Sequence, residues 1–178
     1  MGASTLSSPR RWLYALKPAS WPKVLVPALL GQAMGFRAES GVSLGGLAAG
    51  LAFTVFDIVF IVLLNDWGDV AVDTLKRRMF PQAGSPKTIP DGILPARSLL
   101  LGGAVAGALA LLTARAAESL LPRPGFTAAA ALCLAFFVAY TLPPVRLNYR
   151  GGGELLEGVG VGALLPWLNA YGQGGDPW

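Results

Sequence analysis

Four side chains with oxygen donors lie within residues 65–73, which read NDWGDVAVD. In one continuous helix, Asn65, Asp69 and Asp73 stand four residues apart and share a face, and Asp66 lies one position round from Asn65. Carboxylates at this spacing repel one another. The repulsion grows beside lipid, where the dielectric constant falls. The segment therefore predicts a positively charged partner.

Two kinds of partner fit the aspartates, and both stay open at this point. The basic run Lys76, Arg77 and Arg78 follows at once and could pair with them. Alternatively, the cluster binds Mg²⁺, which takes oxygen ligands, commonly one or two carboxylates completed by water and phosphate. A helix C-terminus also attracts cations. The plain alternative is a solvated helix end that carries interfacial charges.

Composition narrows the chemistry further. The chain has no histidine and one cysteine, which excludes histidine bases, zinc–thiolate sites and an intrachain disulfide. Hydrophobic residues make up 53% of its 178 residues and charged residues 13%, against about 25% charged residues in a typical soluble domain. The sequence therefore predicts an integral membrane protein in contact with the lipid bilayer.

Five apolar segments are long enough, or nearly so, to cross a bilayer. They are residues 21–36, 44–64, 99–114, 126–142 and 155–171. Glycine and alanine recur in all of them and favour close helix packing. Asp57 is the only charged residue of the second segment, so it is a candidate functional residue. It could be neutral, paired with Lys23, or facing a polar cavity.

The basic residues indicate the orientation. Most of them fall before residue 18, in residues 65–97 or in residues 143–154. Positive charge marks the cytoplasmic side of a membrane protein. We therefore expect these three segments, including the N-terminus, to be cytoplasmic. A bacterial inner membrane is the membrane that we expect to hold the chain. The net charge of +4 then reflects topology and not a nucleic-acid partner.

Several segments carry a family resemblance. NDWGDVAVD matches the NDxxDxxxD pattern of the UbiA-type intramembrane prenyltransferases. LKPASWPKVLVPALLGQAMG, SPKTIPDGILP and YTLPPVRLNYRGGGELLEGVGVGALLP resemble further segments of that family, in the same order. The last two are most similar to the menaquinone-type branch, which prenylates dihydroxynaphthoate. Together the segments span residues 16–166, nearly the whole chain.

The resemblance implies a fold and an activity. The fold would be all-α, a transmembrane bundle of about five helices, with residues 1–178 forming one membrane domain that corresponds to the N-terminal portion of a nine-helix family fold. The activity would be Mg²⁺-dependent transfer of an isoprenyl group from a prenyl diphosphate to an aromatic, quinone-precursor-like acceptor.

The resemblance also implies roles for particular residues. Asp66, Asp69 and Asp73 would form the catalytic set and, with Asn65, would hold Mg²⁺. Lys87 and Asn65 would bind the diphosphate. The acceptor and the prenyl group would meet Tyr140, Arg146, Lys17 and Asn148.

The chain also departs from the family pattern. The family carries a second aspartate motif after its fifth helix, and these 178 residues hold no matching segment. We therefore expect either a second polypeptide that supplies the C-terminal half or a truncated chain. The alternative function is that of a non-catalytic membrane protein or an ion-conducting transport protein that uses Asp57 and the aspartate cluster.

Overall fold

The structure is a computed structural model that describes residues 7–38, 41–81 and 86–174. Within these residues it contains helices and connecting loops and no β-strand. The helices are α1 (Ser8–Leu16), α2 (Pro22–Ala38), α3 (Leu44–Gly68), α4 (Val70–Met79), α5 (Ala96–Leu120), α6 (Phe126–Thr141), α7 (Gly153–Val159) and α8 (Leu165–Gln173). A π-helical segment, η4 (Gly160–Leu164), joins α7 to α8.

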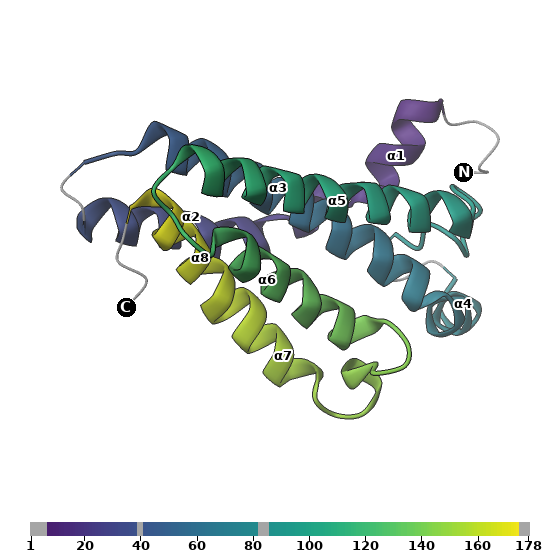
Figure 1. Cartoon of the computed structure of the whole chain (residues 1–178). Coiled ribbons are helices and arrows are strands. Elements are labelled where there is room, and N and C mark those ends of the chain that lie inside the picture. Colours follow the sequence, from purple (N-terminus) through teal and green to yellow (C-terminus); the bar gives the residue numbers. More distant parts are fainter. Residues whose placement is uncertain (1–6, 39–40, 82–85, 175–178) are drawn as a thin grey trace.

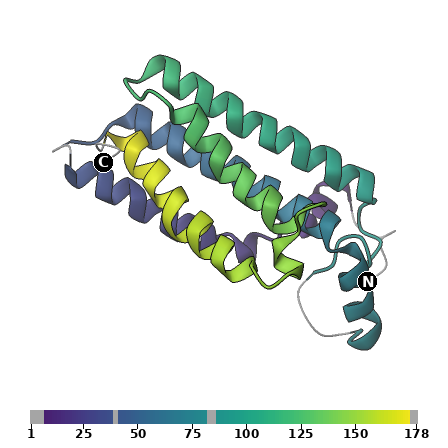
Figure 2. The same cartoon turned by 60° about the horizontal axis from the view of Figure 1, so that its bottom comes forward.

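Five long rods form the bundle: α2, α3, α5, α6 and the combined α7–η4–α8 helix (Figures 1 and 2). This arrangement confirms the expected all-α bundle of about five helices. Several rods extend beyond the predicted spans, because a hydropathy pattern detects only their apolar part. For example, α5 continues through Arg115 and Glu118 to Leu120. By length and composition, α3 and α5 can each cross a membrane, and α6 is a shorter apolar helix.

Small residues let the rods approach closely. A Cβ atom added at Gly103 of α5 would lie 2.5 Å from Leu64 of α3, and one at Gly107 would lie 2.8 Å from Phe60. On α2, a Cβ atom at Gly31 would lie 2.0 Å from the carbonyl oxygen of Pro166 in α8. Gly31 thus lies against backbone atoms of α8, whereas Gly103 and Gly107 lie against side chains of α3. Small residues at such positions let helices pack closely.

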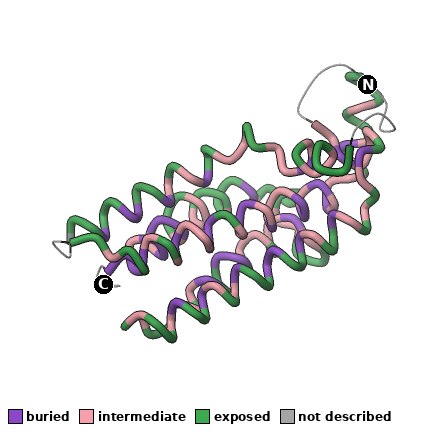
Figure 3. Tube along the Cα trace, turned by 90° about the horizontal axis from the view of Figure 1, so that it is seen from above, coloured by how far each residue is buried: buried purple, intermediate pink, exposed green. Residues whose placement is uncertain are grey.

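Burial follows the inner faces of these rods (Figure 3). Phe53, Ile58, Leu168 and Phe126 are almost fully buried where α3, α8 and α6 meet. Large apolar side chains also point outward from α2 and α5, for example Leu30 and Leu112. Apolar residues on both the inside and the outside of a helix bundle are expected when lipid surrounds it.

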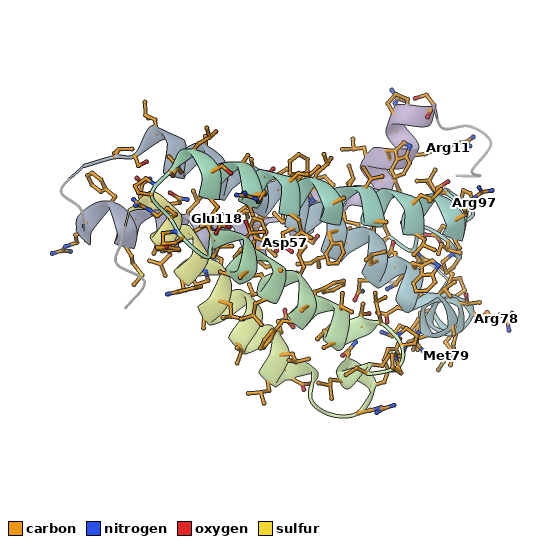
Figure 4. The ribbon with its side chains drawn as sticks, viewed as in Figure 1. Arg11, Asp57, Arg78, Met79, Arg97 and Glu118 are labelled. Carbon is orange, nitrogen blue, oxygen red and sulfur yellow. The ribbon has the colours of Figure 1, made fainter. Side chains whose placement is uncertain are left out.

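The segments predicted to be cytoplasmic lie together. The helices α1 and α4 and the loops at 86–95 and 142–152 gather at one end of the bundle (Figure 1). Arg11, Arg78 and Arg97 lie at this end, which we call the basic end, whereas Glu118 lies toward the other end (Figure 4). The fold thus separates charge along the bundle in the way that the sequence pattern predicts.

One expectation about the aspartate segment is wrong. The second apolar helix does not continue straight to Asp73. Instead, α3 ends at Gly68, Asp69 has φ −93° and ψ 6°, and α4 begins at Val70 and runs in a different direction (Figure 1). Asn65 and Asp66 therefore lie on α3 and Asp73 on α4, with Asp69 at the bend.

Candidate functional site

A pocket of about 290 Å³ opens among α2, α3, α6 and the α7–η4–α8 rod. Its residues near the basic end are polar and include Lys17, Asn65, Asp66, Lys87 and Tyr140. Its deeper wall is mostly apolar and includes Ile61, Phe136, Phe137, Val161 and Leu165. The pocket can therefore take a ligand with a charged head and an apolar body.

Asp66 is the most enclosed carboxylate at the polar end, with 3% of its surface exposed. Lys17 forms an ion pair with its Oδ1 atom, and the Thr88 hydroxyl donates to its Oδ2 atom at 2.6 Å. Lys17 directly follows α1 as its C-cap and has φ 48°, in the left-handed region, which few non-glycine residues adopt. A basic and a neutral donor thus hold Asp66 at the pocket wall.

The loop at 86–95 links both sides of the α3–α4 bend. Lys87 lies 2.6 Å from Oδ1 of Asp73 on α4, while its neighbour Thr88 binds Asp66 on α3. Asp73, like Asp66, is buried. Consecutive residues of one loop therefore position carboxylates from two helices.

Asp69 has different partners at the bend. The amide of Asn65 donates to its Oδ2 atom at 3.0 Å, and the hydroxyl of Tyr149 donates to its Oδ1 atom. Partial burial and this hydrogen bond raise the pKa of Tyr149 to about 12. Tyr149 therefore remains a hydrogen-bond donor to Asp69 at neutral pH.

Asp91 connects the loop to α1 and α4. Its carboxylate accepts hydrogen bonds from the Tyr14 hydroxyl at 2.6 Å, from Nη2 of Arg77 at 2.8 Å and from the backbone N–H of Lys87 at 3.0 Å. Partial burial alone would raise the pKa of Asp91, but the hydrogen bonds from Tyr14, Lys87 and Arg77 outweigh it and lower that pKa. In the structure, therefore, Arg77 of the basic run pairs with Asp91, outside the aspartate cluster.

The oxygen-bearing side chains of the site suit one of the ways in which proteins bind Mg²⁺. Among the described residues, no three carboxylate, cysteine or histidine side chains lie close enough to enclose a metal by themselves. Asn65 and Asp66, whose side chains carry oxygen atoms, nevertheless line the pocket, and Mg²⁺ commonly uses one or two carboxylates and completes its shell with water and substrate phosphate. The site therefore fits Mg²⁺ bound together with a phosphorylated ligand.

The structure places the predicted residues in two groups. Lys17, Asn65, Asp66, Lys87 and Tyr140 line the pocket, and Asp69 and Asp73 adjoin it through Asn65 and Lys87.

The second group, Arg146 and Asn148, does not line the pocket. Arg146 donates to the carbonyl oxygen of Gly68 at 2.7 Å and its guanidinium lies 5.1 Å from the centre of the Tyr149 ring. Asn148 lies against Gly153, at the start of α7. Arg146 therefore holds the 142–152 loop against the end of α3, whereas Asn148 lies beside the start of α7.

Sequence reasoning missed Thr88, Asp91, Tyr14 and Tyr149. Thr88 and Asp91 lie within SPKTIPDGILP, the segment that carries Lys87. Their proximity to Lys87 was the only signal in the sequence, because their partners are distant along the chain.

Fold and site together define an α-helical membrane protein in which carboxylate and lysine side chains lie at one end of an apolar pocket. The chain belongs to the UbiA prenyltransferase family, whose model matches residues 24–178. A search of curated proteins gives no match.

Its fold is similar to that of a UbiA homolog from Archaeoglobus fulgidus bound to DMAPP and Mg²⁺, with a TM-score of 0.66 and 22% sequence identity. The match covers 92% of this chain and 53% of that chain. The chain therefore spans about half the length of that homolog.

Proposed function

We propose that this chain carries a prenyl diphosphate site and takes part in the transfer of an isoprenyl group to an aromatic acceptor in the membrane. The observation that carries the proposal is the set of neighbouring carboxylate–lysine pairs, Lys17–Asp66 and Lys87–Asp73, at the polar end of an apolar pocket. A prenyl diphosphate has the same arrangement, with a charged diphosphate head and an apolar hydrocarbon tail.

The two lysines suit the departing diphosphate. During transfer, the bond between the allylic carbon and the diphosphate oxygen breaks and the bonding electrons stay with the diphosphate. Lys17 and Lys87 lie where they can donate hydrogen bonds to phosphate oxygens and stabilise that charge. Asn65 and Asp66, which line the pocket, would hold Mg²⁺ there, and Asp69 and Asp73 would support them through Asn65 and Lys87. When bound, Mg²⁺ neutralises phosphate charge as a Lewis acid.

Aromatic side chains suit the allylic cation. Phe137 and Tyr140 stack with ring centres 6.2 Å apart, and both line the pocket beside Phe136. The faces of aromatic rings attract a cation, and the apolar wall keeps water from capturing it. A ring carbon of the acceptor forms the new carbon–carbon bond and then gives up its proton.

The finer parts of the proposal rest on the resemblance of particular segments. The acceptor is a quinone precursor of the menaquinone-branch type, and the chain lies in a bacterial inner membrane with a cytoplasmic N-terminus. Residues 1–178 form one membrane domain. We propose that the second aspartate set faces the same cavity and comes from outside residues 1–178, for example from a second polypeptide.

Mg²⁺-dependent binding of geranyl diphosphate to the full chain in lipid nanodiscs tests this function. We expect binding to need Mg²⁺ and to fall at least tenfold in Asp66→Ala, which leaves Lys17 and Thr88 without their carboxylate. Glu154→Gln, an exposed carboxylate of α7, is the matched control and should bind as the wild type does. Equal binding by the wild type and Asp66→Ala contradicts the proposal.

The same preparation distinguishes the proposed function from the alternative, which is ion conduction. An ion-conducting protein would pass ions through liposomes, would lose the flux in Asp57→Asn, and would not bind geranyl diphosphate. The buried carboxyl of Asp57 is the observation that favours this alternative.

A further inference from the structure

Asp57 carries a carboxyl group in the interior of the bundle, away from the ion pairs of the basic end. It lies midway along α3 (Figure 4) with 4% of its surface exposed, and it lines the deep part of the pocket. Its Oδ1 atom is buried and has no hydrogen-bond partner among the described residues. Lys23, one of the partners considered from the sequence, lies instead 3.9 Å from Glu157.

The lysines that line the pocket pair with other carboxylates: Lys17 with Asp66, Lys23 with Glu157 and Lys87 with Asp73. From the helices packed against α3, the deep wall receives Val24 of α2, Cys133 of α6 and Leu165 of α8. One turn earlier on α3, the Thr54 hydroxyl donates to the carbonyl oxygen of Gly50 at 2.8 Å and accepts a hydrogen bond from Asn169 at 3.2 Å. Buried polar groups are almost always hydrogen-bonded, so Asp57 is an exception that a ligand would explain.

The position of Asp57 limits what that ligand can be. Asp57 precedes Asp66 by nine residues on one helix, which is about 13 Å along the axis. The pocket is thus polar at both ends and apolar between them. A hydrocarbon tail has no donor to offer Asp57, so a ligand that satisfies this carboxyl must carry a polar atom into the deep part of the pocket.

Another wall of the same pocket contains an irregular helical segment. The π-helical segment η4 contributes Gly160 and Val161 to the lining, and such segments occur frequently at functional sites. A Cβ atom at Gly160 would meet only Phe136, at 3.8 Å. This wall therefore leaves room for a ring.

We propose that Asp57 accepts a hydrogen bond from a hydroxyl group of the aromatic acceptor and so selects hydroxylated rings. The identity of the ligand as the acceptor rests on the proposed function. In either protonation state, a carboxyl group offers an oxygen that can accept such a bond. A ring that carries its only polar group as a carboxylate would not be selected at this position, because it has no proton to donate and repels an ionised Asp57.

Two probes of similar shape test the hydroxyl preference. In the full chain in nanodiscs, titration calorimetry with empty nanodiscs subtracted would compare 2-naphthol with 2-methoxynaphthalene, which cannot donate. We expect wild type to bind 2-naphthol about threefold to tenfold more tightly, the range that one hydrogen bond supplies. Asp57→Leu should lose this preference, and Asp57→Asn should keep part of it because its amide oxygen still accepts.

Thermal unfolding tests whether Asp57→Leu loses the preference for 2-naphthol only because the variant is less stable. Because Asp57→Leu removes a buried carboxyl whose Oδ1 atom has no hydrogen-bond partner in the described part of the chain, its melting temperature should equal or exceed that of wild type. Equal affinity of wild type for the two probes overturns the proposal, and so does an unchanged preference in Asp57→Leu. If wild type prefers 2-naphthol through Asp57 but fails to bind geranyl diphosphate, the hydroxyl site stands and the proposed function falls.

Discussion

At the scale of single residues, Asp91 is a positioning residue whose effect reaches the pocket. It holds Tyr14, Arg77 and the backbone N–H of Lys87, and the Lys87 side chain in turn contacts Asp73. Asp91→Asn removes the charge that pairs with Arg77, so we expect the loop to loosen and the affinity for geranyl diphosphate to fall about threefold to tenfold. Binding measurements in nanodiscs, with Glu154→Gln as the control, check this prediction.

The pH dependence of stability tests the same contact. Because the folded-state pKa of Asp91 lies below its ordinary value of 3.8, the ionised form stabilises the fold. This stabilisation is fully present above that ordinary value and is lost as the pH falls through the lowered pKa. We expect the melting-temperature difference between wild type and Asp91→Asn to stay constant from about pH 8 to pH 5 and to shrink below about pH 4. A difference that grows in acid contradicts this assignment.

The sequence predicted those site residues whose spacing or motif carries information. Asn65, Asp66 and Lys87 come from the aspartate motif and the segment that follows it, and the structure places all of them at the pocket. Asp91 could not be predicted in the same way. Its contact with Tyr14 joins residues 77 positions apart, and no local pattern marks such a pair.

At the scale of helices, the α2–α8 contact depends on glycine. Gly31 and Gly35 stand four residues apart on α2, and added Cβ atoms would lie 2.0 Å and 2.3 Å from carbonyl oxygens of Pro166 and Ala170. These are backbone atoms, so they cannot rotate out of the way. Beside them, the buried amides of Gln32 and Asn169 form a hydrogen bond of 2.9 Å, which depends on the same separation of the helices.

Gly31→Ala should therefore push α2 away from α8. We expect it to destabilise the chain by about 1–3 kcal/mol, the usual cost of overpacking, seen as a lower melting temperature in nanodiscs. Gly162→Ala is the matched control, since a Cβ atom there meets nothing within 4 Å. A melting temperature for Gly31→Ala that equals the control's would show that the two helices do not pack this closely.

Hydropathy predicted the five rods but not the bend between α3 and α4. Helical periodicity describes side chains on a straight axis, and residues 65–73 fit that pattern well. The bend follows from tertiary contacts: Gly68 approaches Thr141 of α6, Arg146 binds its carbonyl oxygen, and Tyr149 binds Asp69. All three partners come from residues 141–149, far from the bend in sequence.

At the scale of the whole molecule, polarity changes along the bundle more than across it. The ion pairs of Asp66, Asp73 and Asp91 all lie near the basic end. Among the described residues, the buried polar side chains of the middle and far parts are amides and a hydroxyl, with Asp57 as the one carboxylate. Neither Arg115 nor Glu118, toward the far end, is buried. The charge count along the sequence predicted this division, because helices that alternate in direction return every second loop to the same end.

That division predicts the orientation of the chain, which thiol labelling can test. In a Cys133→Ala background, Arg78→Cys places a thiol at the basic end and Leu120→Cys, at an 82% exposed residue, places one at the end of α5 near Glu118. If the basic end is cytoplasmic, a membrane-impermeant maleimide should label Leu120→Cys in intact cells and Arg78→Cys only after permeabilisation. The reverse pattern would place the lysine–aspartate pairs outside the cytoplasm and would contradict the predicted orientation.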